Sequence, residues 1–201
     1  MNSLIPLLLF LTIFLFFFLF FPPSSSPTTS TVAATYSTST FPNQISLKLV
    51  QKELIQKVCS KTSNRTFCVE TLESDPRTPS AYNLPSLARI AIELSIANVS
   101  DTQALIASKL RGDTTDPDVK HTLKWCVTWY TEVIALLRSA VTALEVDIKS
   151  AHQNIYTAGE YMGYCESNMD YGGVLDSWIL TGNQFSDYLL DIAFFSTIEG
   201  L

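Results

Sequence analysis

The chain has 201 residues, a formal net charge of −6, and no Asp, Glu, Lys or Arg before Lys48. This acidic balance argues against a nucleic-acid partner, because such partners require a basic surface. With the uncharged N-terminal segment set aside, about 160 residues remain, enough for one domain with a core of ordinary size.

The first 34 residues are interpreted as a signal peptide. Residues 4–21 are almost wholly apolar, and a Ser/Thr-rich stretch with small residues at 32–34 follows, which is typical of an export signal. The apolar run is long and has no preceding Lys or Arg, so an uncleaved membrane anchor is the alternative. Residues 35–44 are expected to be a Ser/Thr-rich linker. The position of cleavage stays open, and after cleavage the secreted protein is expected to have no membrane contact.

From residue 45 onward the pattern is helical, and residues 45–201 are expected to form one domain. Two short amphipathic segments, 45–60 and 67–72, predict a helical hairpin that extends to residue 80, where Asp, Pro and Thr break the pattern. Four longer helices are predicted at 85–111, 117–144, 147–170 and 174–198.

The predicted ends of the long helices carry typical signals. Pro85 suits a first helical turn, Gly112 suits a C-terminal stop, and Asp116 followed by Pro117 reads as an N-cap and first helical residue. Short connections force antiparallel neighbours, so residues 85–198 predict an all-α, up-down-up-down four-helix bundle. In the last helix the residues expected to point inward are Trp178, Phe185, Tyr188, Ile192 and Phe195.

Four cysteines in an exported chain favour two disulfide bonds. Cys126 and Cys165 each lie on an apolar helical stripe, and their midpoint falls at the break between two helices. Folding the chain back at that break puts both cysteines about 30 Å from the turn, so they face each other. Cys59 and Cys68 flank a short polar loop. The sequence therefore predicts Cys59–Cys68, which staples the hairpin, and Cys126–Cys165 inside the bundle.

No active site, cofactor site or metal site emerges from the pattern. The two histidines, His121 and His152, lie on successive helices and are separated by roughly twenty residues of rise, so a shared catalytic site is not expected. Both are expected to be solvated, and no CxxC or ExxH spacing supplies a metal ligand set. Trp125 and Trp129 share a helix face beside Cys126 and are interpreted as core or rim aromatics. A rigid exported bundle without chemistry of its own is typical of a binding module.

Two tripeptides match the N-glycosylation sequon. They are Asn64-Arg65-Thr66 and Asn98-Val99-Ser100. Because export would expose the chain to glycosylation, Asn64 and Asn98 are both candidate sites.

Four short motifs stand out: Cys59-x-x-Thr62 with Cys68, Leu72-x-Ser74-Asp75-Pro76-Arg77, Leu123-x-x-Cys126-x-x-x-Tyr130, and Cys165-Glu166. Over about residues 45–198, they resemble the motifs of the plant invertase and pectin methylesterase inhibitors. The resemblance implies a four-helix bundle with an N-terminal hairpin, first-to-second and third-to-fourth disulfides, and export to the cell wall (apoplast) or the vacuole. It also implies a one-to-one complex that covers the cleft of a target enzyme. Tyr164 departs from the Thr that often precedes the last family cysteine.

The implied target is pectin methylesterase, with cell-wall or vacuolar acid invertase as the alternative. Invertase inhibitors of this family often carry Pro-Lys-Phe seventeen residues before the last cysteine, where this chain has Ile148-Lys149-Ser150. Only the lysine matches, which favours pectin methylesterase. An enzyme, a small-ligand-binding secreted helix bundle and a membrane-anchored structural protein are the interpretations from other classes.

The docking surface is expected on the second and third bundle helices, away from their buried stripes. The disulfide between these helices should stiffen this face and lower the entropy cost of docking. The candidate residues are the polar ones on these outer faces: Lys120, Lys124, Thr128, Glu132, Lys149, Gln153, Thr157 and Glu160.

Overall fold

The computed structural model describes residues 41–112, 116–174 and 176–198, with side chains from Lys48 onward. The predicted signal peptide and the predicted linker up to residue 40 lie outside the described residues. None of the helices described is both long enough and apolar enough to cross a membrane.

Regular secondary structure in the described part of the chain is entirely helical. The first helix begins inside the predicted linker, before the expected start at residue 45, and the other predicted boundaries agree within about one helical turn. A short 3-10 helix in the loop after the hairpin was not predicted. In chain order the elements are α2 (Phe41–Cys59), α3 (Arg65–Ser74), η1 (Thr78–Ser80), α4 (Leu84–Arg111), α5 (Pro117–Ala143), α6 (Ile148–Tyr171) and α7 (Ser177–Ile198).

All four bundle helices begin at a side chain that accepts a hydrogen bond from the first turn, and in α7 the acceptor is Asp176, at 3.0 Å. Asn83 caps α4 at 2.9 Å, Asp116 caps α5 at 2.9 Å, and Asp147 caps α6 at 3.1 Å, each through a side-chain oxygen. These bonds satisfy backbone N–H groups that have no partner inside the helix. The predicted cap at Asp116, followed by Pro117 in the first turn, is confirmed.

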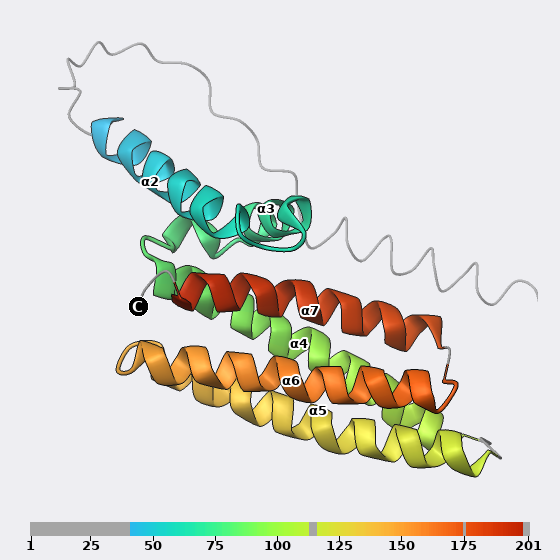
Figure 1. The fold of residues 1–201 in the computed structure, drawn as a ribbon. Helices are drawn as coiled ribbons and strands as arrows, with labels where there is room; N and C mark the ends of the chain where they lie inside the picture. The colour runs from blue at the N-terminus through green and yellow to red at the C-terminus, as the bar shows by residue number, and fades with distance from the viewer. Residues whose placement is uncertain (1–40, 113–115, 175, 199–201) are drawn as a thin grey trace, which may run out of the picture. The chain divides into compact units, whose positions relative to one another are not determined.

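Helices α4 to α7 form the predicted antiparallel four-helix bundle (Figure 1). Each helix packs on the next in sequence, and α7 closes the ring against α4. Apolar stripes of α5 and α6 meet in the core, where Cys126 and Cys165 are fully buried. They form a disulfide with Cα atoms 4.8 Å apart. The buried Tyr130 hydroxyl donates a hydrogen bond to Asn183 of α7, so the core is also crossed by a polar contact.

The predicted inward face of α7 is partly wrong. Trp178 is 72% exposed and Phe185 is 43% exposed, although Ile192 is fully buried as expected. Tyr188 and Phe195 are half-buried. The residues that α7 does bury include a set of small and polar side chains: Asn183, Ser186, Ala193, Ser196 and Thr197.

Close packing of α7 against α4 explains the small residue at Ser186. A Cβ atom placed on Gly182 of α7 would lie 2.4 Å from Thr102 Oγ1 of α4, far inside van der Waals contact. Four residues further along α7, Ser186 Oγ donates to Asn98 Oδ1 of α4 at 2.5 Å. A large apolar side chain therefore has no room at the levels of Gly182 and Ser186 in α7.

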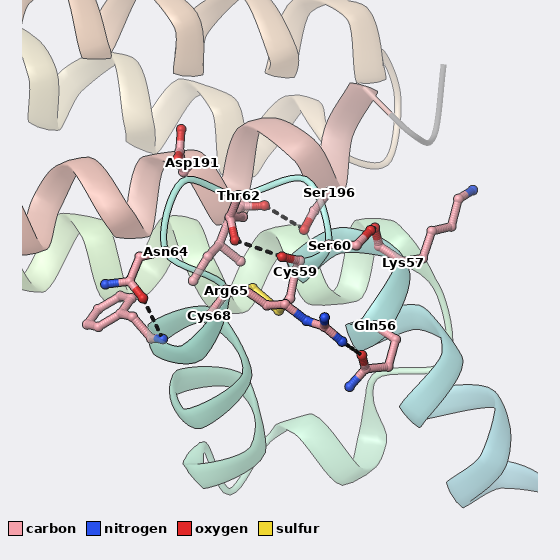
Figure 2. Close-up of a disulfide and its surroundings, with 12 residues drawn as sticks. Gln56, Lys57, Cys59, Ser60, Thr62, Asn64, Arg65, Cys68, Asp191 and Ser196 are labelled. Atoms are coloured by element: carbon pink, nitrogen blue, oxygen red, sulfur yellow. Dashed lines mark hydrogen bonds between the residues drawn. A yellow bond between two sulfur atoms is a disulfide. The ribbon is translucent and has the colours of Figure 1, made fainter.

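Helices α2 and α3 form the N-terminal hairpin. The structure joins Cys59 and Cys68 in a disulfide with Cα atoms 5.5 Å apart, and Figure 2 shows it where α2 ends and α3 begins. Thr62 Oγ1 donates to the carbonyl of Cys59 at 3.0 Å. The short loop is thus held by its disulfide and by a local hydrogen bond.

The hairpin docks on the bundle through α7. The backbone N–H of Ser63 donates to Asp191 Oδ2 at 3.0 Å. The ring of Phe67 stacks against Phe185 with centroids 5.7 Å apart, and lies 5.2 Å from the ring of Tyr188. Two aromatic residues of α7 that were expected in the bundle core therefore pack against the hairpin.

Arg77 links the segment that follows the hairpin to α4. Its guanidinium donates to both carboxylate oxygens of Asp75, at 2.9 and 2.7 Å, and also pairs with Glu93 of α4. The hydrogen bond from Arg77 holds the pKa of Asp75 below its usual range. The Asp75-Pro76-Arg77 motif thus fixes the chain where the hairpin meets the bundle.

Candidate functional site

The two histidines lie apart and in different surroundings. His121 is exposed on α5 and accepts a hydrogen bond from Trp125 Nε1 at 2.9 Å. His152 on α6 was expected to be solvated, but it is half-buried: its ring lies 4.4 Å from the Phe194 ring, and Nδ1 lies 2.9 Å from Thr197 Oγ1. Burial lowers the pKa of His152. Among the residues described, no group of three or more His, Cys, Asp or Glu side chains is arranged to hold a metal ion.

The predicted docking residues lie on the outer surface of α5 and α6. Those on α5 repeat every fourth residue, so they form one row along the helix. All are exposed except Thr157, which is half-buried and accepts a weak hydrogen bond from Gln153 at 3.4 Å. The eight residues are Lys120, Lys124, Thr128, Glu132, Lys149, Gln153, Thr157 and Glu160.

The structure brings only part of this set together. The Cys126–Cys165 bond fixes the antiparallel register, which places Glu160 level with Thr131 but Lys149 level with Thr142. Thr142 lies ten residues beyond Glu132 in α5, which is about 15 Å along the helix axis. The middle of the face therefore combines Thr128 and Glu132 with Thr157 and Glu160, while Lys149 and Gln153 lie near the α5–α6 turn.

An aromatic cluster lies on the same side of the α5–α6 pair. The rings of Trp125 and Trp129 stack with centroids 5.7 Å apart. The Trp129 ring lies 6.1 Å from that of Tyr164 on α6, which in turn lies 5.8 Å from that of Tyr161. Trp125 is 45% exposed and Tyr164 is 50% exposed. With His121 against Trp125 at 6.1 Å, these five residues form one continuous set of rings that we call the aromatic cluster.

Only two of the five residues in this cluster were grouped from the sequence. Trp125 and Trp129 were recognised as sharing a helix face, but their partners on α6 were missed. The cysteine register was already sufficient, because it places Tyr164 level with Val127, midway between the two tryptophans. Applying that register to the aromatic residues, and not only to the apolar stripe, would have revealed the cluster.

The outer face of α5 and α6 is held rigid by a disulfide beneath the aromatic cluster and by a hydrogen bond near the α5–α6 turn. The disulfide joins α5 and α6 directly under the cluster, and both of its cysteines have no exposed area. Toward the turn, Asn154 Nδ2 of α6 donates to Ser139 Oγ of α5 at 3.1 Å. A surface fixed in this way loses little conformational entropy when it binds another protein.

A groove of about 480 Å³ opens between α6 and α7, on the other side of α6. Its apolar residues include Leu190 and Phe195, and its acidic ones are Glu160, Asp187 and Asp191. The pKa of Asp187 is raised to about 6. The larger cause is partial desolvation and the smaller is repulsion from nearby carboxylates, although the residue remains exposed.

Both disulfides, the disulfide-linked helices and the aromatic cluster all fall within a single family match. The profile described as plant invertase/pectin methylesterase inhibitor matches residues 53–191, more than half of the chain. The chain belongs to this family. The motif residues Asp75, Arg77 and Tyr130 of this family member thus have structural roles, in the hairpin exit and in the core.

Two curated relatives carry names from the two branches of the family. A protein of Actinidia deliciosa named "Pectinesterase inhibitor" is 33% identical over 123 residues, which cover 60% of this chain and 64% of that protein. A protein of Arabidopsis thaliana named "Cell wall / vacuolar inhibitor of fructosidase 2" is 30% identical over 137 residues, or 68% of this chain and 74% of that protein. The match to the first relative therefore spans less than two thirds of its length.

A solved structure supports the fold. The crystal structure of a mutant form of a pectin methylesterase inhibitor from Arabidopsis aligns with a TM-score of 0.65 at 23% identity, covering 72% of this chain and 95% of that chain. At this identity the likeness establishes the helical architecture alone.

Proposed function

We propose that this family member is a protein inhibitor of pectin methylesterase that acts by forming a one-to-one complex over the active-site cleft of the enzyme. The observation that carries the proposal is the family match over residues 53–191. The relative named "Pectinesterase inhibitor" supports this target. So does the departure from Pro-Lys-Phe at Ile148-Lys149-Ser150. No catalytic activity of its own is proposed.

The docking surface is the outer face of α5 and α6, centred on the aromatic cluster. Tryptophan and tyrosine are enriched among the residues that contribute most to protein–protein binding, because they bury a large area at low entropy cost. Trp125 and Tyr164 are both about half exposed in the free protein, so an enzyme surface can cover them. Lys120, Lys124 and Glu132 on α5, with Glu160 on α6, supply charge around the cluster.

Acid invertase is the second candidate target. The relative named "Cell wall / vacuolar inhibitor of fructosidase 2" matches a larger share of this chain, at 68%, than the pectinesterase inhibitor does, at 60%. Lys149 also stands where the invertase inhibitors of the family often have the lysine of their motif. The fold and the docking face would be the same for either target.

Export to the cell wall is part of the proposal, with the vacuole as the alternative. Its support is the apolar segment 4–21 followed by a Ser/Thr-rich stretch, together with the two disulfides, which persist in oxidising compartments. Cleavage near residue 34 would release the helical domain from the membrane.

Alanine substitution in the aromatic cluster tests the docking surface. The doubly substituted protein, with Trp125→Ala and Tyr164→Ala, is expected to inhibit pectin methylesterase at least about 30-fold less well, since residues of this kind contribute 2 kcal/mol or more. Trp178→Ala on α7 is the matched control, because Trp178 is also exposed, at 72%, and lies outside the α5–α6 face. Equal inhibition by the double variant and the control would show that docking uses another face.

A further inference from the structure

The two glycosylation sequons occupy very different places in the fold. We propose that the exported protein carries an N-linked oligosaccharide at Asn64 and none at Asn98. The inference rests on the proposed export but is independent of the target enzyme. In this modification Asn64 Nδ2 forms a bond to the anomeric carbon of a lipid-diphosphate-linked oligosaccharide, the carbon–oxygen bond to phosphate breaks, the lipid diphosphate leaves, and the amide loses one proton.

Asn64 is half-buried, and its amide oxygen caps a helix while its amide nitrogen points away from that helix (Figure 2). It is the N-cap of α3, and Oδ1 accepts a hydrogen bond from the backbone N–H of Phe67 at 3.1 Å. In Figure 2 the amide nitrogen of Asn64 lies opposite the hydrogen-bonded oxygen. It points away from α3 and from the disulfide. A glycan replaces one hydrogen on that nitrogen and leaves Oδ1 as an acceptor, so the helix cap survives the modification.

The neighbours of Asn64 in the sequence are open to solvent, although Asn64 itself is half-buried. Ser63, Arg65 and Thr66 are all exposed, and the tripeptide lies in the loop and first turn between Cys59 and Cys68. Bulky glycans belong on exposed positions of this kind.

Asn98 is also half-buried, but it lies where α4 packs on α7. Its Oδ1 accepts a hydrogen bond at 2.5 Å from the hydroxyl of Ser186, a residue of α7 with no exposed area. Its neighbour Val99 has no exposed area either. An oligosaccharide on this side chain would have to lie where α7 packs.

The hydroxyl of the second sequon is also engaged. Ser100 Oγ donates to the carbonyl of Ile96 at 2.6 Å, within the helix. Next to this sequon, Gly182 of α7 and Thr102 of α4 approach so closely that the two helices are in direct contact. A chain modified at Asn98 could not close α7 on α4, so the folded exported protein should lack a glycan there.

Intact mass measurement of the full chain, expressed in plant cells and purified from cells and medium together, tests the inference. The wild type is expected to exceed the mass calculated for its cleaved, disulfide-bonded chain by one oligosaccharide. Thr66→Ala and Asn64→Asp should both remove the extra mass, and aspartate at residue 64 keeps the N-cap. Ser100→Ala is the matched control and should retain the full increment.

Peptide mapping of each protein locates the modified residue, and thermal unfolding confirms that each variant is folded. A glycan on Asn64 alone, lost in both first-sequon variants, supports the inference. A wild type without a glycan would overturn it, as would a glycan found on Asn98 or an increment lost in Ser100→Ala. Inhibition of pectin methylesterase by an unglycosylated wild type would separate the failure of this inference from that of the proposed function.

Discussion

Removing the disulfide between α5 and α6 is expected to destabilise the protein more than any single surface change. The bond joins cysteines separated by 39 residues, whereas the hairpin bond joins cysteines separated by 9. The loop-entropy relation gives about 4 kcal/mol for the longer loop and about 2.7 kcal/mol for the shorter. The first value is large beside a total stability of about 5–15 kcal/mol for a domain of this kind.

The comparison uses two doubly substituted proteins, Cys126→Ala with Cys165→Ala and Cys59→Ala with Cys68→Ala. Alanine is preferable to serine because all four sites are fully buried and a hydroxyl there would need a partner. Equilibrium unfolding in urea, followed by circular dichroism, measures the loss. A loss below about 1 kcal/mol from the longer loop, or a greater loss from the hairpin pair, would refute the reasoning.

Three further predictions concern the bundle itself. Gly182→Ala should destabilise the protein by about 1–3 kcal/mol because the new methyl group meets Thr102, whereas Gly159→Ala, with nothing near its Cβ, should stabilise it by about 0.5–1 kcal/mol. Asn83→Ala should cost about 0.5–2 kcal/mol because α4 loses its cap. The pKa of Asp187 is raised to about 6 from an ordinary value of 3.8, so the folded state holds the proton more tightly. Stability should therefore fall as pH rises from about 4 to 6, and Asp187→Asn should abolish that part of the fall.

Each of these predictions has a result that would contradict it. Chemical denaturation that finds Gly182→Ala as stable as Gly159→Ala would mean that α4 and α7 are not in close contact. An unchanged unfolding midpoint in Asn83→Ala would show that the Asn83 cap does not stabilise α4. For Asp187→Asn, the unfolding free energy of the variant must rise relative to that of the wild type between pH 4.5 and 7. A constant difference over that range would contradict the prediction. The difference between wild type and variant isolates Asp187 from His152, whose lowered pKa makes folded stability rise with pH just below 6.5.

The bundle could be predicted because its signals are local and periodic. The stripes that carry Cys126 and Cys165 have helical spacing, and Asp116 before Pro117 marks a helix start by a mechanism that needs no tertiary contact. The short links between long helices then leave antiparallel packing as the simple arrangement. These features depend on residues near one another in the sequence.

The inward face of α7 could not be predicted by the same reasoning. Hydrophobicity ranks Trp178 and Phe185 above Ser186, but a close approach of two helices favours the smallest side chain. That approach depends on Thr102, which lies eighty residues earlier in the sequence from Gly182. The aromatic cluster was incomplete for a related reason, since Tyr164 becomes a neighbour of Trp129 only through the register of the hairpin.

Stoichiometric titration tests the central claim most directly. Purified exported protein is added in steps to a fixed amount of pectin methylesterase and, separately, of acid invertase, and the residual activity of each enzyme is measured. Pectin methylesterase activity is expected to fall linearly to an end point at one inhibitor per enzyme, while invertase keeps its activity. Potent inhibition of invertase with none of pectin methylesterase would contradict the target assignment, and inhibition of neither enzyme would contradict the proposed function.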